Sequence, residues 1–469
     1  MPLIWNGAFR GLADSKFSGV EGSFAECVGI DGNSTPGLLK VHQKLTLETT
    51  GTEPDELCKV AIAASNGYSF WFSSISGKIW ARNSSGTWSL ALTTTAAAGD
   101  VFCLGAIEYN GFIYWATQSR LHRIAIANAD DAWASEVLNW ATFAVTDASW
   151  HPMVIQDATL FIGDGNRVCS VNDQGTFDNN ALDIKTPYRI KTMITYELDV
   201  LIGTYVADTV NKTEVLKWDT VSPSWNTSDP IEEVGINAFI RDDNRMLVNA
   251  GRAGNIYLYD GEKLHPHKRI PGTYSNTAYG YVHPNSVGNF KGLPVFGFSN
   301  GSGNPASQGV YTLGSYSKDY PRLLDLTFVN SQDKVATQEM GAILVLDFDL
   351  MVAWKDSSNY GVDAIDYSNK YASAYFETTM LLQKDRDKLK TLSEVAVFYN
   401  SLPADTNITF SYSVNGASYV AMTSVTDAIL NKVFAELSVE NIGSLQIKVT
   451  FTVSSNNAPT MEALGVEIS

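Results

Sequence analysis

A turn followed by a short apolar strand recurs seven times along the chain, and this repeat restricts the fold more than any other feature of the sequence. In one unit, for example, Asn110-Gly111 precedes the apolar run at residues 112–115. The intervals between successive units are 44, 48, 40, 46, 47 and 57 residues, counted from Gly67, Gly111, Thr159, Asp199, Arg245, Gly292 and Asp349. A four-stranded propeller blade needs roughly 40–50 residues, so this spacing is typical of consecutive blades.

Each unit continues with a second turn and a strand in which apolar and polar residues alternate. These downstream strands lie at residues 77–80, 120–124, 167–171, 214–218, 255–259, 309–313 and 360–365. A period of two places one face of each strand against a neighbouring sheet. We therefore predict an all-β fold with a β-propeller of about seven blades over residues 59–370. A string of unrelated hairpins is the alternative, but it gives no reason for a near-constant interval.

The segment before the repeats, residues 1–58, is predicted to contain an extended N-terminal arm and a strand that closes the ring. Propellers often close with a strand borrowed from the other end of the chain. The stretch at residues 38–47 could therefore pack beside the seventh blade. Glycines interrupt the short apolar groups of residues 1–36, so this part is expected to be extended.

Four aromatic side chains of the arm are candidate assembly anchors. They are Trp5, Phe9, Phe17 and Phe24. Large apolar side chains are costly to leave in water, so we expect the arm to lie on a neighbouring subunit. A flexible tail is the alternative.

After residue 370 the rhythm of the sequence changes. Short apolar runs at residues 371–382, 392–399, 407–414, 432–439, 444–453 and 463–468 alternate with turns. This pattern predicts a C-terminal β-sandwich over residues 371–469. Residues 427–437 fit either a strand or an amphipathic helix, and the charged patch at 384–388 is expected to be a solvated loop.

The formal net charge of −17 limits the partners that the protein can bind. An acidic surface repels phosphate backbones, which disfavours tight binding of nucleic acid but suits a pore through which DNA slides. No apolar stretch is long enough to span a membrane, and no secretion signal is visible, so synthesis in a cytoplasm is expected. The widely spaced Cys27, Cys58, Cys103 and Cys169 are interpreted as buried small hydrophobes, not as disulfides or zinc ligands.

No catalytic motif stands out, so we predict no catalytic residues, no metal site and no cofactor. His265-Pro266-His267 offers two metal ligands without a visible third. Residues 84–88 and 173–177 resemble in part the Ser-x-Asp-x-Gly-x-Thr-Trp turn of sialidase-type propellers, but neither has the required Asp spacing. Surface tryptophans could stack on sugar rings, although packing within the blades is the simpler interpretation. These are Trp88, Trp133, Trp140 and Trp225.

The overall plan of the chain resembles a group of virion proteins from tailed bacteriophages. The residues that carry the resemblance are Trp5-Asn6-Gly7-Ala8-Phe9-Arg10-Gly11, Cys27-Val28-Gly29-Ile30-Asp31, Thr35-Pro36-Gly37-Leu38-Leu39-Lys40, Val352-Ala353-Trp354-Lys355-Asp356 with Tyr360-Gly361-Val362-Asp363, and Tyr375-Phe376-Glu377-Thr378 with Asp387-Lys388-Leu389-Lys390. The resemblance covers both ends and the seventh blade. The intervening blades match only in the spacing of their repeats. These motifs are structural, and no catalytic residues come with them.

The resemblance implies a structural protein of the virion, made in the host cytoplasm, that is a ring component of the tail or neck and resembles a tail nozzle. Its partners would be copies of itself, other tail or neck proteins, and DNA in transit without tight binding. A carbohydrate- or receptor-binding tail protein is the first alternative. A sialidase-like glycoside hydrolase is the second, and it needs paired carboxylates and basic groups at the propeller axis.

Overall fold

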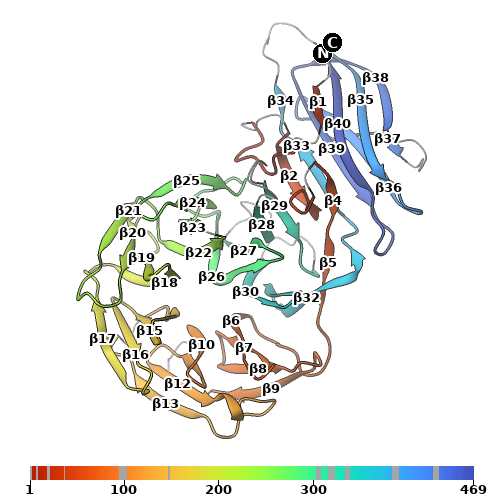
Figure 1. Ribbon diagram of the computed structural model, residues 1–469. Coiled ribbons are helices and arrows are strands. Elements are labelled where there is room, and N and C mark those ends of the chain that lie inside the picture. The colour runs from red at the N-terminus through yellow and green to blue at the C-terminus, as the bar shows by residue number, and fades with distance from the viewer. Residues whose placement is uncertain are drawn as a thin grey trace.

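The computed structural model describes residues 3–6, 9–17, 22–35, 37–94, 103–145, 148–243, 245–302, 308–314, 323–332, 338–382, 390–425 and 432–468. These residues form an all-β protein of forty strands and one short 3₁₀ helix, η1 (Ile126–Asn128). Figure 1 shows the two parts of the molecule, a ring of small sheets and a second β-structure that stands beside the ring.

The ring consists of four-stranded antiparallel sheets arranged as the blades of a β-propeller (Figure 1). The innermost strands are β6 (Cys58–Ala63), β10 (Gly105–Tyr109), β14 (Met153–Gln156), β18 (Arg189–Tyr196), β22 (Ile236–Asp242), β26 (Tyr279–Phe290) and β30 (Gln338–Leu346). The second strands are β7 (Ser69–Ser73), β11 (Phe112–Ala116), β15 (Thr159–Asp164), β19 (Asp199–Tyr205), β23 (Arg245–Ala250), β27 (Leu293–Ser302) and β31 (Asp349–Asp356).

The outer half of each blade completes the sheet. The third strands are β8 (Lys78–Arg82), β12 (Arg120–Ala125), β16 (Arg167–Val171), β20 (Thr213–Trp218), β24 (Asn255–Tyr259), β28 (Gly309–Gly314) and β32 (Asn359–Lys370). The outermost strands are β9 (Trp88–Thr93), β13 (Val137–Thr142), β17 (Phe177–Asp183), β21 (Thr227–Ile231), β25 (Leu264–Arg269), β29 (Leu323–Phe328) and β5 (Gln43–Leu47).

The recurring turns of the sequence join the first strand of each blade to the second. In the second blade, Asn110 and Gly111 have φ angles of 48° and 78°, so both lie in the left-handed region. A two-residue hairpin turn of this kind matches the twist of its strands, and Asn-Gly is its preferred sequence. The apolar runs after the turns are the second strands, whose side chains are largely buried between blades. The prediction of an all-β, propeller-type architecture is therefore confirmed.

The ring is closed by a strand from the N-terminal segment. β5 pairs antiparallel with β32, with Leu45 opposite Ile365. Leu45 is 2% exposed and packs in the core of that blade with Val352 and Trp354. The next blade lies close by, because a Cβ on Gly341 would meet the carbonyl oxygen of Cys58 at 2.2 Å. The first and last blades are thus joined through both the closing strand and direct backbone proximity.

The remaining strands form two sheets that share one hydrophobic core. The first sheet has the order β3 (Ile30–Asp31), β4 (Leu39–Val41), β40 (Thr460–Ile468), β35 (Lys390–Ser401) and β38 (Lys432–Ile442), with β1 (Leu3–Asn6) also paired to β40. The second has the order β2 (Phe24–Val28), β33 (Tyr375–Thr378), β39 (Ser444–Thr452), β36 (Asn407–Val414) and β37 (Val420–Val425), with β34 (Leu381–Leu382) paired to β39. Buried residues of both sheets, such as Val397 and Val449, belong to one core cluster.

The N-terminal segment differs from the expected extended arm on a neighbouring subunit, because its strands are built into this second β-structure. Phe24 lies in β2 and is 1% exposed, and its ring centroid lies 4.7 Å from that of Phe376. Phe9 is 2% exposed in the same core. The interpretation of these two side chains as anchors on a neighbouring subunit is therefore corrected. The apolar surface that would be costly in water is covered by strands of the same chain.

Three smaller expectations can be compared with the structure. All four cysteines are buried and have free thiols. Residues 432–437 belong to strand β38, so this half of the ambiguous segment at 427–437 is not helical. The rest of that segment and the charged patch at 384–388 lie outside the described residues.

Leu45→Ala tests the closing strand. We expect this substitution to lower the free energy of unfolding by about 2–5 kcal/mol, because it removes a buried side chain from the strand that completes the ring. Leu90→Ala, at a leucine that is 41% exposed in β9, is the matched control and should change stability by about 0.5 kcal/mol or less. Urea unfolding followed by tryptophan fluorescence measures both. Equal effects of the two substitutions would contradict a structural role for β5.

Candidate functional site

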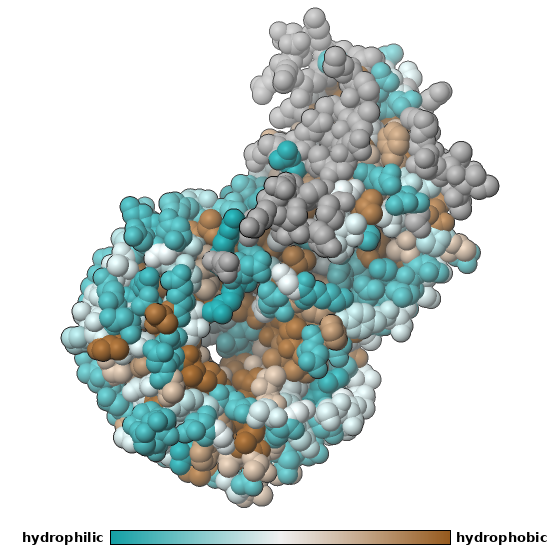
Figure 2. Space-filling view, in the orientation of Figure 1, coloured by the Kyte–Doolittle hydropathy of each residue, from teal (hydrophilic) through white to brown (hydrophobic). Residues whose placement is uncertain are grey.

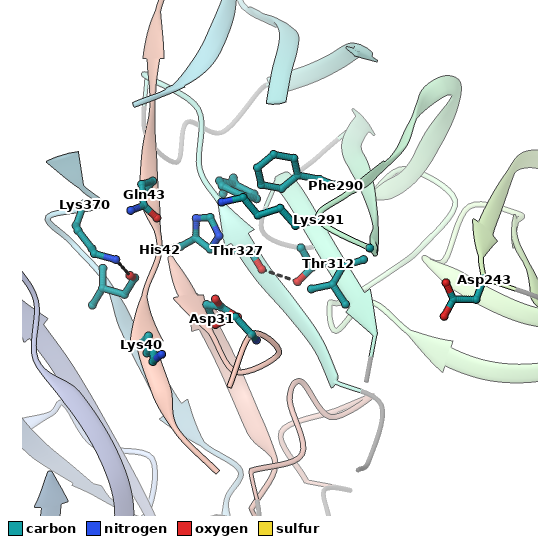
Figure 3. Close-up of a pocket in the computed structure, with 15 residues that line it drawn as sticks. Asp31, Lys40, His42, Gln43, Asp243, Phe290, Lys291, Thr312, Thr327 and Lys370 are labelled. Carbon is teal, nitrogen blue, oxygen red and sulfur yellow. Dashed lines mark hydrogen bonds between the residues drawn. The ribbon is translucent and has the colours of Figure 1, made fainter. Parts of the chain in front are cut away.

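One pocket lies where the N-terminal strands cross the edge of the sixth blade, β26–β29 (Figure 3). Its volume is about 570 Å³, a size typical of small-molecule sites. The labelled lining residues are Asp31, Lys40, His42, Gln43, Asp243, Phe290, Lys291, Thr312, Thr327 and Lys370. They come from β3 to β5, the β22–β23 and β26–β27 turns, two strands of the sixth blade, and the end of β32.

Three lysines surround this pocket. The Lys40 Nζ donates a hydrogen bond to Thr35 Oγ1 at 2.7 Å, and the Lys370 Nζ donates to the Val41 carbonyl at 2.8 Å. The Lys291 Nζ lies 5.0 Å from the ring centroids of both Phe290 and Tyr367. Burial lowers the pKa of Lys370; Asp31 opposes that shift, and the positive charges of the other two lysines add to it.

His42 stands at the centre of the lysine group in Figure 3. Burial lowers its pKa to about 4, so the imidazole is neutral at physiological pH. Its ring packs edge-on against Phe328 at a centroid distance of 4.1 Å. The Nδ1 atom is buried and has no hydrogen-bond partner among the described residues. The imidazole therefore adds a polar wall to the pocket but no charge.

Asp325 in β29 is a fully buried carboxyl group that shares its neighbour Asn33 with the pocket residue Thr312. Asn33 Nδ2 lies 3.5 Å from Asp325 Oδ2 and 3.4 Å from Thr312 Oγ1, so it is placed to donate to both. Burial, together with the nearby negative charge of Asp31, raises the pKa of Asp325 to about 7. At neutral pH this group is therefore partly protonated inside the joint between the ring and the N-terminal strands.

A second polar cluster lies at the propeller axis. Trp150, just before β14, contacts His283 of β26 with ring centroids 5.1 Å apart. These residues belong to the third and sixth blades, so their contact crosses the centre of the ring. The Lys191 Nζ donates to Asn237 Oδ1 at 2.8 Å and lies 5.6 Å from the Trp150 ring. Burial lowers the pKa of Lys191 to about 8. Figure 2 shows how narrow the opening at the centre of the ring is.

Carboxylates are few on the innermost strands, which line the propeller axis. The seven innermost strands carry Glu108, Asp242 and Glu339, and only Glu339 lies at the same end as Lys191. Glu339 is held in an ion pair with Lys59 at 2.8 Å. The innermost strands alone therefore do not supply the paired carboxylates that a glycoside hydrolase needs.

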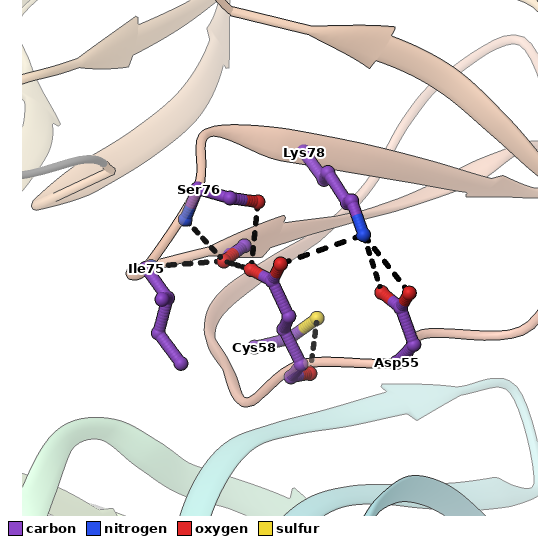
Figure 4. A network of polar contacts seen from close by, with 7 residues as sticks. Asp55, Cys58, Ile75, Ser76 and Lys78 are labelled. Atoms are coloured by element: carbon purple, nitrogen blue, oxygen red, sulfur yellow. Dashed lines mark hydrogen bonds and ion pairs between the residues drawn. The ribbon is translucent and has the colours of Figure 1, made fainter.

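A polar network fixes the linker between β5 and β6 (Figure 4). The Lys78 Nζ donates to both carboxylate oxygens of Asp55 at 2.9 Å and lies 3.5 Å from Glu56 Oε1. Glu56 accepts hydrogen bonds from the hydroxyls of Ser73 and Ser76. These contacts hold the chain where it passes from the last blade to the first. A second pocket, of about 560 Å³, lies beside this linker and includes Glu48, Glu53 and Asp55 among its lining residues.

The candidate residues from the sequence are distributed over the molecule and do not form one site. Phe17 is 58% exposed, and Trp5 lies in β1. Trp88 and Trp133 are buried within blades, as the packing interpretation expects. His265 pairs with Asp260 at 2.8 Å. Over the described ranges, no group of three His, Cys, Asp or Glu residues could hold a metal ion.

The two turns that resemble sialidase-type turns do join the third and fourth strands of their blades. In the first, Asn83 Oδ1 accepts hydrogen bonds from the backbone N–H groups of Ser85 and Thr87. In the other, Asn172 Oδ1 accepts the equivalent bonds from Gln174 and Thr176. The asparagine shapes the turn, so these motifs serve the fold.

The pocket could not be predicted from the sequence, because its lining residues come from segments that are far apart in the chain. The Lys291-Gly292 turn and the stretch at residues 38–47 were each predicted as structural features. Nothing in the sequence indicated that they meet.

Comparison with known proteins gives weak likenesses. No family model and no curated protein matches the chain. The extracellular domain of a hybrid two component system from B. thetaiotaomicron is 12% identical, with a TM-score of 0.47 over 71% of this chain and 41% of its own length. Streptogramin B lyase is 10% identical, with a TM-score of 0.46 over 69% of this chain and 97% of its own. Virginiamycin B lyase from Staphylococcus aureus is 11% identical, with a TM-score of 0.45 and coverages of 69% and 99%. Likenesses at this level carry no inference about function.

The described residues also contain no helix that is both long and apolar enough to cross a membrane.

Asp325→Asn tests the buried carboxyl beside the pocket. The unfolded chain loses this proton near pH 4, but the folded chain keeps it up to about pH 7, so stability falls as the pH rises between these values. The expected loss is about 1.4 kcal/mol per pH unit, or about 2–3 kcal/mol from pH 5 to pH 8. The amide does not ionise, so the variant should lack this component in urea unfolding at the two pH values.

Asp173→Asn, at an exposed carboxyl group, is the matched control and should keep the pH dependence of the unsubstituted protein. The same pH dependence in the Asp325→Asn variant would contradict the assignment.

Proposed function

We propose that this chain is a structural component of a tailed-phage virion, a subunit of a tail or neck ring that resembles a tail nozzle. In this proposal it is a seven-bladed propeller with an attached β-sandwich, and it acts by subunit assembly and not by catalysis. Segments that resemble phage virion proteins support it. Those around Gly11, Val28 and Phe376 meet at the joint between the propeller and the C-terminal sheets.

The joint is made of backbone hydrogen bonds. β2 pairs in parallel with β29 of the sixth blade and antiparallel with β33, so one continuous sheet runs from the ring into the second β-structure. Gly11, with a φ of 68°, lies directly against the same blade. A Cβ added at Gly11 would lie 2.8 Å from the Leu324 nitrogen. A side chain would clash there, which accounts for the glycine that ends the first motif.

The motif of the seventh blade is also part of the ring closure. The Trp354 Nε1 donates to Asp363 Oδ1 at 2.7 Å, and Asp363 also accepts bonds from the Ser331 N–H at 2.6 Å and from its hydroxyl at 2.7 Å. Burial raises the pKa of Asp363 to about 6. All these groups are structural. A propeller that is joined to the C-terminal sheets by backbone hydrogen bonds suits a subunit that transmits load between its neighbours in a ring.

In this proposal DNA passes through the lumen of the assembled ring and not through the propeller itself. The Trp150–His283 contact crosses the propeller axis and leaves no room for a duplex. The innermost strands are not acidic either, because they carry Lys59, Arg189, Lys191 and Arg241 against three carboxylates. The net charge of −17 therefore lies on other surfaces, which would repel DNA in transit.

One observation favours carbohydrate or receptor binding as a second function. Trp150 and Tyr281 lie beside the Lys191 ammonium at the mouth of the propeller channel, and aromatic rings with polar partners are typical of sugar sites. A glycan array separates the two proposals, because a purely structural subunit should bind no glycan.

Phe17→Ser tests the assembly proposal. Phe17 is exposed, and its ring lies 5.1 Å from the Lys16 ammonium, so its loss should reduce ring formation without lowering stability. Leu198→Ser, at a leucine that is 76% exposed on a blade turn, is the matched control. Negative-stain images of the purified protein, and of particles carrying a tagged copy, measure the outcome. A protein that stays monomeric and never enters particles would contradict the proposal.

A further inference from the structure

We propose that the pocket between the N-terminal strands and the sixth blade binds a compact polyanion, such as a small polycarboxylate or a phosphate-bearing metabolite. This inference goes beyond the assembly role and does not depend on it. It rests on the cavity of about 570 Å³ and on the three lysines that line it.

The charges around the pocket are not balanced by the protein. Lys40, Lys291 and Lys370 face the same cavity, and Asp31 is the one carboxylate among them in Figure 3. Asp31 Oδ1 already accepts hydrogen bonds from the N–H groups of Asn33 and Ser34, at 2.9 and 2.8 Å. The other lining carboxylate, Asp243, belongs to the neighbouring blade and stands apart from the lysines.

Such a group of cations is unusual in a chain with a net charge of −17. Bringing three ammonium groups together costs free energy, and a bound anion removes that cost while accepting charge-assisted hydrogen bonds. The two lysines that donate to Thr35 Oγ1 and to the Val41 carbonyl keep further N–H groups for a ligand. The site is therefore partly organised before the ligand arrives.

The walls indicate the size and character of the ligand. The Phe290 and Phe328 rings close one side, and the hydroxyls of Thr312 and Thr327, 2.6 Å apart, close another. His42 also lines the pocket and is neutral, so it adds a polar side chain without a charge. A metal cation is disfavoured by the lysines, and a long nucleic acid is disfavoured by the acidic surface outside the pocket.

The test is isothermal titration of the full chain with citrate and, separately, with pyrophosphate at constant ionic strength. Binding of either ligand supports the proposal. Citrate alone identifies a carboxylate ligand, and pyrophosphate alone identifies a phosphate ligand. Lys291→Met should weaken binding by about tenfold or more, because it removes one charge-assisted contact. Lys291 lies on an exposed turn, so the variant is expected to fold, and its melting temperature checks this.

Lys263→Met is the matched control, since Lys263 is exposed on a turn of another blade and does not line the pocket. It should bind like the unsubstituted protein. The proposal is overturned if neither anion binds more tightly than acetate, if Lys291→Met binds normally, or if Lys263→Met weakens binding equally.

Discussion

The pairing of β5 with β32 is the interaction on which the ring depends. It joins segments about 320 residues apart, since Thr46 and Asp366, which lie on these two strands, are separated by that distance in sequence. Until this pair forms, the last blade lacks its outer strand. Loop-closure entropy makes such a distant pairing slow, so the ring is expected to close late in folding.

The same N-terminal segment serves both halves of the molecule. β2 lies between a blade and the C-terminal sheets, and β5 follows it after a short stretch of chain. The Tyr371 N–H donates to the His42 carbonyl at 3.0 Å, which holds the start of the C-terminal unit against this segment. Movement of the C-terminal sheets relative to the propeller therefore requires backbone hydrogen bonds to break, in addition to side-chain contacts.

The repeating blades could be predicted from the sequence because they follow local rules. Turns such as Asn110-Gly111 favour one backbone geometry, and the period of two in the following strands fixes which side chains are buried. The destination of the first residues could not be predicted in this way. The segment around Gly11 and Gly29 has no strand periodicity, and its partners β29, β33 and β40 are set by distant packing. The same holds for the pocket, where Lys40, Lys291 and Lys370 meet only after the ring and the joint have formed.

The pairing of β1 with β40 places the two ends of the described chain side by side, with Leu3 opposite Val466 (Figure 1). A pulling force applied to these ends would act first on the pairing of β1 with β40 and on the end of the pairing of β40 with β35, and would separate these hydrogen bonds one after another. The tension would reach the blades only after β1 had been peeled away. The terminal strand is thus the first element to separate under load. The propeller blades would keep their structure while it detaches.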